Sequence, residues 1–156
     1  MKKMLLMGAL LFVGSAHAAS SGELTISGTV VPVNELEITP NADATNLNIL
    51  LGETNKLVAS VSETSNNLTG YKISMRSVNT SKLVHGVDSS KTTAYTISYD
   101  GGTAVSLTTS DQEVKNVTSL DGLTTVSSNV NVNVTAYPTA PAGTYSDTVT
   151  ISIAAN

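Results

Sequence analysis

The sequence predicts an all-β protein, and an immunoglobulin-like β-sandwich is the architecture that fits it best. Thr, Ser, Val and Asn dominate the chain beyond its first 18 residues, and β-branched residues suit a pleated sheet. Short stretches that alternate between apolar and polar residues recur, with turn residues about every ten positions. About seven or eight such strands fit this length, which favours a sandwich over a small closed barrel.

The N-terminus has the features of a secretory signal peptide covering residues 1–18. Lys2 and Lys3 precede an apolar run at residues 4–13, and Ala16-His17-Ala18 supplies a small-x-small cleavage pattern. The apolar run is too short to span a bilayer, so no retained membrane anchor is expected. Cleavage after Ala18 would leave 138 of the 156 residues, which is enough for one domain.

The charge and the cysteine content of the mature chain restrict its partners. Loss of Lys2 and Lys3 leaves 6 basic against 12 acidic residues, which argues against nucleic acid or anionic lipid as a partner. The chain has no cysteine, although small secreted domains often rely on disulfides. The fold must therefore be stabilised by packing alone or by pairing with another chain.

The first alternating segment covers residues 24–33. One side of this segment carries Leu24, Ile26, Gly28 and Val30, and threonine or serine occupies the other side up to Thr29. A period of two is that of an extended strand with one face against an apolar surface. Residues 19–33 are therefore expected to form an extended N-terminal element ahead of a globular domain at residues 34–156.

Several internal regions are expected to form the strands of the domain. They lie at residues 47–51, 57–61, 71–76, 82–88, 95–99, 105–107 and 130–134. Asp100-Gly101-Gly102 separates two of these regions, and glycine supplies the positive φ of a tight hairpin turn. Residues 138–143 then form a loop that leads into the last strand.

The final fourteen residues are predicted to form a half-buried strand. The side expected to face inward carries Tyr145, Val149, Ile151, Ile153 and Ala155, while Thr148, Thr150 and Ser152 lie opposite. An apolar strand needs a partner, because an unpaired sheet edge is a template for another chain. That partner is either the N-terminal segment of the same chain or a strand donated by a different one.

The sequence predicts neither an enzyme nor a metal or cofactor site. His85 is the one histidine beyond the leader, whereas a nucleophilic triad needs a base placed by fold geometry and zinc needs several ligands. His85 could reach Asp88, but a packed histidine is the preferred interpretation. Glu35 and Glu37 share one side of an extended segment and could act as glycosidase carboxylates, yet no aromatic sugar platform accompanies them.

Both ends of the mature chain resemble those of pilins of the chaperone–usher pathway, the fimbrial subunits of Gram-negative bacteria. Gly143 lies fourteenth from the C-terminus, within the run Ala-Gly-Thr-Tyr-Ser-Asp at residues 142–147 that precedes the alternating terminal strand. Gly28 is similar to the small residue that many donor strands place in a shallow pocket. Residues 70–74 and 95–101 resemble those of spore-coat-U-like subunits. Ala155 departs from the penultimate tyrosine of many such pilins, and the disulfide frequent in the family is absent.

The resemblance implies an incomplete immunoglobulin-like sandwich whose last strand is supplied in trans. A periplasmic chaperone lends a strand first, and the N-terminal extension of another copy replaces it at an outer-membrane usher. The donor residues would be Leu24, Ile26, Gly28 and Val30. The acceptor and chaperone-binding edge would comprise Gly143, Tyr145, Val149, Ile151 and Ile153. The product would be an extracellular fimbria, reached through the periplasm, that supports adhesion or biofilm formation and can carry a tip adhesin.

Two other functions remain open at the level of sequence. A self-contained β-sandwich, such as a secreted adhesin or carbohydrate-binding module, would be stable as a monomer. A coat protein of the spore-coat-U type would use the same fold in a different assembly. A pilin would instead depend on strand exchange or on its chaperone.

Overall fold

A computed structural model describes residues 21–156, so the predicted signal peptide lies outside the described residues. The chain divides into an N-terminal segment that ends at Val30 and a compact domain, Val31–Asn156. Residues 21–33 belong to no strand within the described part of the chain. The first strand of the described residues begins at Asn34.

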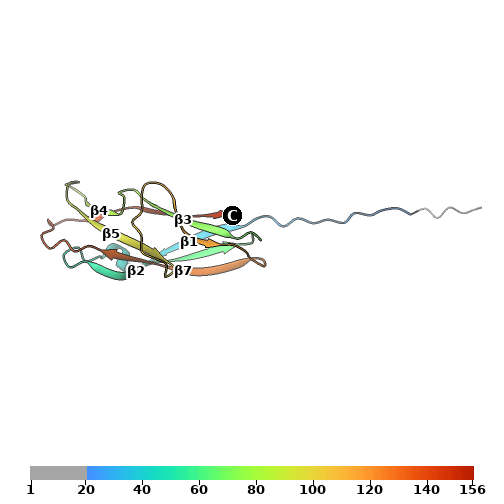
Figure 1. Cartoon of the computed structure of the whole chain (residues 1–156), viewed down its shortest axis with the longest axis horizontal. Coiled ribbons are helices and arrows are strands. Elements are labelled where there is room, and N and C mark those ends of the chain that lie inside the picture. The colour runs from blue at the N-terminus through green and yellow to red at the C-terminus, as the bar shows by residue number, and fades with distance from the viewer. Residues whose placement is uncertain (1–20) are drawn as a thin grey trace, which may run out of the picture. The chain divides into compact units, whose positions relative to one another are not determined.

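The described residues form nine strands and one short 3-10 helix (Figure 1). The elements in chain order are β1 (Asn34–Pro40), η1 (Ala42–Thr45), β2 (Glu53–Ser65), β3 (Tyr71–Ser77), β4 (Lys82–His85), β5 (Thr92–Tyr99), β6 (Gln112–Val117), β7 (Thr124–Val134), β8 (Tyr145–Ser146) and β9 (Val149–Ala155). The all-β prediction is confirmed.

The strands form two antiparallel sheets. One has the order β1-β2-β7-β5-β4-β8, and the other has the order β6-β3-β9. Strand β2, with 13 residues, is the longest strand of the larger sheet and pairs with β1 on one side and β7 on the other. Strand β3 is central in the smaller sheet, between β6 and β9.

A single apolar core lies between the sheets. The strands place alternate residues inward, so that β3 buries its first, third and fifth side chains. The buried apolar residues are Ala59, Val61, Tyr71, Ile73, Met75, Leu83, Tyr95, Ile97, Tyr99, Leu107, Val130, Val132 and Val134. The aromatic residues of this core are tyrosines. Their buried hydroxyl groups need hydrogen-bond partners inside the core.

The expected strand at residues 47–51 is wrong, because this region forms a turn. The Asn48 carboxamide accepts a hydrogen bond from the Leu51 N–H (3.0 Å), and the Asn48 N–H donates to the Glu53 carboxylate (2.9 Å). Gly52 follows with φ +77°, a conformation that favours glycine. Local side-chain hydrogen bonds therefore override an alternating pattern that resembles a strand.

The terminal strand is present but divided. β8 pairs with β4 in the larger sheet, whereas β9 pairs with β3 in the smaller one. The chain passes from one sheet to the other at Asp147 and Thr148. The two halves of one alternating segment thus belong to different sheets, which period-two patterning cannot reveal.

Several of the loops lie at two opposite ends of the domain. At the proximal end, where Val31 enters the domain, residues 66–70 and 118–123 meet through a hydrogen bond from the Leu120 N–H to the Leu68 carbonyl (3.3 Å). The distal end contains residues 41–52, 86–91 and 135–144 and lies at the left of Figure 1. There the Tyr137 N–H donates to the Ile49 carbonyl (2.8 Å), and the Gly86 N–H donates to the Thr144 carbonyl (2.9 Å).

Candidate functional site

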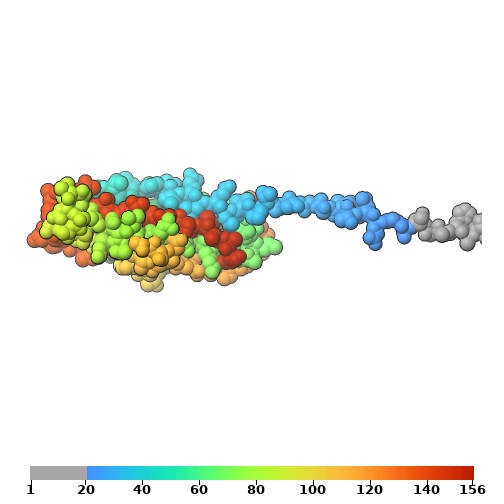
Figure 2. Space-filling model, turned by 90° about the horizontal axis from the view of Figure 1, so that it is seen from above, coloured from blue at the N-terminus to red at the C-terminus, as the bar shows by residue number. Residues whose placement is uncertain are grey.

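The candidate site is a groove between β1 and β9, at the open side of the two sheets. Within the described chain β1 pairs with β2 alone and β9 pairs with β3 alone, so each presents a free edge. The two strands lie close to each other, and Figure 2 shows red β9 running beside the cyan N-terminal part of the domain. An unpaired edge presents N–H and C=O groups that another strand can bind.

The groove opens onto the core. A cavity of about 410 Å³ lies here, and core side chains including Met75, Ile97 and Val132 form its floor. Ile38 and Pro40 of β1 form one wall. Val149 and Ile151 of β9 form the opposite wall. The apolar interior therefore reaches the surface along a strip that is bordered by two free strand edges.

Asp147 lies where the chain crosses from β8 to β9, at the start of the groove wall that β9 forms. Its carboxylate accepts hydrogen bonds from the Ser77 hydroxyl (2.5 Å), the Tyr95 hydroxyl (2.8 Å), the Asn79 N–H (3.0 Å) and the Thr148 N–H (2.7 Å). Burial and the hydrogen bond to Asp147 raise the pKa of Tyr95 well above its usual range. The four donors hold the crossing between the sheets in one place. Sequence reasoning missed this role, and an acidic residue within a Thr- and Val-rich strand was the available signal.

The predicted acceptor residues separate into two groups. Val149 and Ile151 line the groove, and Ile153 follows on the same half-buried face of β9. Gly143 and Tyr145 instead lie near the distal end, around the ring of His85. The structure therefore brings two of the five residues to the groove, a third to the same face of β9, and two to a neighbouring cluster.

His85 has a packing role in this cluster. Its Nδ1 accepts hydrogen bonds from the backbone N–H groups of Val87 (3.2 Å) and Asp88 (3.0 Å). Nε2 must then carry the proton, and it donates to the Ala142 carbonyl (3.1 Å). The Tyr145 ring packs edge-on, with centroids 5.0 Å apart, and a Cβ at Gly143 would collide with the imidazole. The ring therefore joins the 86–91 and 135–144 loops.

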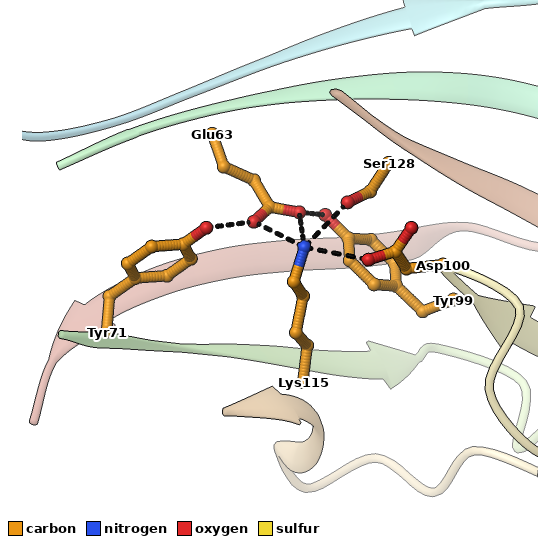
Figure 3. A network of polar contacts seen from close by, with 6 residues as sticks. All are labelled: Glu63, Tyr71, Tyr99, Asp100, Lys115 and Ser128. Carbon is orange, nitrogen blue, oxygen red and sulfur yellow. Dashed lines mark hydrogen bonds and ion pairs between the residues drawn. The ribbon is translucent and has the colours of Figure 1, made fainter. Parts of the chain in front are cut away.

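A second polar cluster lies inside the core, where Glu63 is fully buried (Figure 3). Its carboxylate accepts hydrogen bonds from the hydroxyl groups of Tyr71 (2.5 Å) and Tyr99 (2.6 Å). The Lys115 ammonium group lies 3.1 Å from the same carboxylate, 2.9 Å from that of Asp100, and 2.9 Å from the Ser128 hydroxyl. Every buried side-chain N or O atom of the described residues has a partner.

The charges in this cluster stabilise each other. Burial alone would raise the pKa of Glu63, but hydrogen bonds from Ser128, Tyr71, Tyr99 and Lys115 outweigh it and lower that pKa. Burial would lower the pKa of Lys115, yet hydrogen bonds and charge attraction from Asp100 and Glu63 raise it. Both groups are thus held in their charged forms.

The position of the cluster gives it a structural role. Glu63, Tyr99 and Ser128 come from the larger sheet, whereas Tyr71 and Lys115 come from the smaller one. The cluster therefore connects the two sheets through charged and hydroxyl groups. Sequence reasoning missed it, although Glu63 follows Ala59 and Val61 on the inward face of β2.

The remaining sequence candidates occupy an exposed strand and a turn. Glu35 and Glu37 are exposed on β1 and lie opposite Thr64 and Ser62 of β2. Asp100 and Gly101 occupy a turn with φ +50° and +73°, closed by a hydrogen bond from the Gly102 N–H to the Tyr99 carbonyl (2.8 Å). Among the described residues, no group of three acidic or histidine side chains is placed to hold a metal ion.

Comparison with known proteins yields no assignment. Within residues 21–156, no helix has the length and apolar character needed to cross a bilayer. No protein-family model matches the chain, and a search of curated proteins finds no relative.

Proposed function

We propose that this chain is a structural subunit of an extracellular fibre that assembles by strand donation. The domain would be an immunoglobulin-like sandwich that lacks one strand. The N-terminal segment of another copy would supply that strand between β1 and β9. The observation that carries the proposal is that one chain has both an open apolar groove and an exposed segment with alternating apolar side chains.

The N-terminal segment has the properties of a donor. Leu24, Ile26 and Val30 are 84–85% exposed, an unusual condition for large apolar side chains that recur at alternate positions. The alternating stretch from Leu24 to Val30 has seven residues, the same length as β9. Burial of each large side chain contributes about 1.5–3 kcal/mol, and each ladder hydrogen bond adds roughly 0.5–1.5 kcal/mol.

The contact between copies would be heterologous and would propagate head to tail. A periplasmic chaperone would cover the groove before assembly, and an outer-membrane usher would receive the subunit. Adhesion or biofilm formation would be a property of the finished fibre. A self-contained binding module would be the conclusion if the mature chain proved to be a stable monomer.

Deletion of residues 19–30 tests the donor role. The deletion stops at Val30 because Val31 and Val33 are hydrogen-bonded to Asn66 of the domain. The truncated subunit can accept a strand but cannot donate one. We expect no fibres when it is expressed alone and dose-dependent shortening of fibres when it is mixed with the full chain, as seen by electron microscopy. Fibres of normal length from the truncated chain alone would contradict the proposal.

A peptide experiment tests the groove itself. A synthetic peptide of residues 21–33 should raise the thermal midpoint of the truncated subunit. Nuclear magnetic resonance of the mixture should show that the peptide binds beside β9. The same peptide carrying Ile26→Asp should have no effect, because an unpaired charge would enter an apolar strip. Equal stabilisation by both peptides would show that the segment does not bind through this face.

A further inference from the structure

One attachment of the 86–91 loop requires His85 to be neutral. The backbone N–H groups of Val87 and Asp88 both donate to Nδ1 of the ring, over 3.2 Å and 3.0 Å. Nδ1 must therefore present a lone pair, whereas a protonated ring carries a hydrogen on each nitrogen. Two consecutive backbone N–H groups also form a concave site that favours a negative charge over a cation. Protonation thus removes the acceptor on which this attachment depends.

The attachment on the other side of the ring does not depend on protonation. Nε2 lies 3.1 Å from the Ala142 carbonyl oxygen and donates to it, and a protonated ring keeps this N–H group. His85 also pairs with Tyr145 between β4 and β8, and the two rings pack edge-on. We call the ring and its hydrogen bonds to Val87, Asp88 and Ala142 the His85 junction. It has one pH-sensitive half and one pH-insensitive half.

The charged and titratable groups around the ring come from both attached loops and from β8. Asp88 accepts hydrogen bonds from the Ser90 hydroxyl (2.6 Å) and N–H (2.9 Å). These bonds, and to a smaller extent the charge of Lys91, lower the pKa of Asp88, so its carboxylate is a negative charge that would stabilise a protonated ring. On the opposite side, Tyr145 faces the ring and Tyr137 packs against Tyr145 with centroids 6.5 Å apart. Tyrosine hydroxyl groups are uncharged in neutral and acidic solution.

We propose that the His85 junction is a pH-sensitive attachment, in which protonation of the ring releases the 86–91 loop while the 135–144 loop stays bound. Release takes up one proton, so a falling pH favours the released state. Histidine side chains ordinarily change charge between about pH 5 and 8, and mildly acidic solution is therefore the place to look for release. Neither state of the junction requires strand donation.

Hydrogen exchange of the mature chain, residues 19–156, tests the junction at about pH 7.5 and about pH 5.5. Mass spectrometry follows each segment, with correction for the intrinsic pH dependence of exchange. We expect the protection of residues 86–91 to fall about tenfold or more at the lower pH, while that of residues 135–144 and of β3 is unchanged. His85 is the one histidine beyond residue 18, so the nitrogen resonances of its ring report protonation without ambiguity.

His85→Asn is the matched variant for this experiment. An asparagine side-chain oxygen can accept hydrogen bonds from backbone N–H groups that follow it in a turn, and it has no proton to gain in this pH range. We expect residues 86–91 of this variant to keep the same protection at both pH values. The same acid-induced loss in His85→Asn would assign the effect to a different group and overturn the proposal.

The unmodified chain decides the proposal even if His85→Asn fails to fold. Full protection of residues 86–91 in a chain whose ring is protonated would show that the loop does not depend on Nδ1. A ring that stays neutral down to about pH 5 in the folded domain would show that the junction does not respond to acid. Equal losses in residues 86–91 and 135–144 would show that the two halves of the junction do not differ. Each of these three results contradicts the proposal.

Discussion

At the scale of single residues, Glu63 is a fully buried carboxylate that the fold must provide with hydrogen-bond and charge partners. A buried carboxylate is unfavourable unless its oxygen atoms are paired. Tyr71, Tyr99 and Lys115 supply that pairing, and these residues come from both sheets. The cluster therefore determines how the sheets face each other as well as how a charge is accommodated.

Removing the cation from this cluster should be strongly destabilising. Lys115→Met leaves the Glu63 charge buried without its counter-ion, so we expect a loss of about 3–5 kcal/mol in the free energy of unfolding. Lys72→Met is the matched control, because Lys72 pairs with Glu113 on the surface at 3.3 Å and such pairs contribute about 0–1 kcal/mol. Urea denaturation measures both. Similar losses for the two variants would show that the buried pair has no special role.

The same cluster predicts how stability depends on pH. The pKa of Glu63 is lower in the folded state than its ordinary value of 4.5, so the unfolded chain binds more protons between these two values. The stabilisation from Glu63 is complete above the ordinary value and is lost as the pH falls through the folded value. We expect Glu63→Gln to flatten the fall in stability below about pH 5, followed by urea denaturation at each pH.

The control for this pH experiment is Glu37→Gln on the exposed face of β1. It should leave the slope of the acid limb unchanged. An acid limb equally steep in Glu63→Gln would assign the pH dependence to other carboxylates.

At the scale of secondary-structure elements, the terminal strand and the N-terminal segment have similar sequence patterns but different burial. Both alternate between apolar and polar residues. β9 is half-buried because β3 pairs with it and the core lies beneath it. Residues 24–30 have neither, so the same pattern gives an exposed segment.

The two faces of the N-terminal segment should respond differently to charge. Ile26→Asp is expected to abolish fibre formation, because burial of an unpaired carboxylate would cancel the gain from the apolar strip. Ser27→Asp places the same charge on the opposite face of the strand and should still permit assembly. Electron microscopy and the amount of secreted polymer report both variants. Fibres from Ile26→Asp at the level of Ser27→Asp would show that the two faces are in the wrong register.

At the scale of the whole molecule, the hydrogen bonds between Asn66 and the backbone of Val31 and Val33 should influence how stiff the proposed fibre is. Asn66→Ala removes both side-chain hydrogen bonds that hold Val31 and Val33. The groove and the donor residues remain intact, so fibres should still form. We expect them to bend more, with a shorter persistence length in electron micrographs.

The matched control for fibre stiffness is Asn129→Ala, which removes a surface amide whose contact with Ser60 is 3.5 Å long. This variant should keep the persistence length of the original fibre. If Asn66→Ala fibres are equally stiff, the hydrogen bonds of the Asn66 side chain do not set the angle between subunits.

The sequence alone determined the all-β class and most of the strands, because period-two alternation and β-branched composition are local properties of the chain. It also indicated the alternating segment at residues 24–33 and the turn at Asp100 and Gly101. The pattern could not separate residues 47–51 from a strand, since backbone hydrogen bonds to the side chains of Asn48 and Glu53 decide that turn.

Only the tertiary structure decided which elements face each other. The division of the terminal strand at Asp147, the groove between β1 and β9, and the pairing of Glu63 with Lys115 all join residues that are distant along the chain. Alternation shows that a side chain faces inward, but it does not name the strand or charge opposite it. Those partners follow from the order and direction of strands in the two sheets, which no local pattern records.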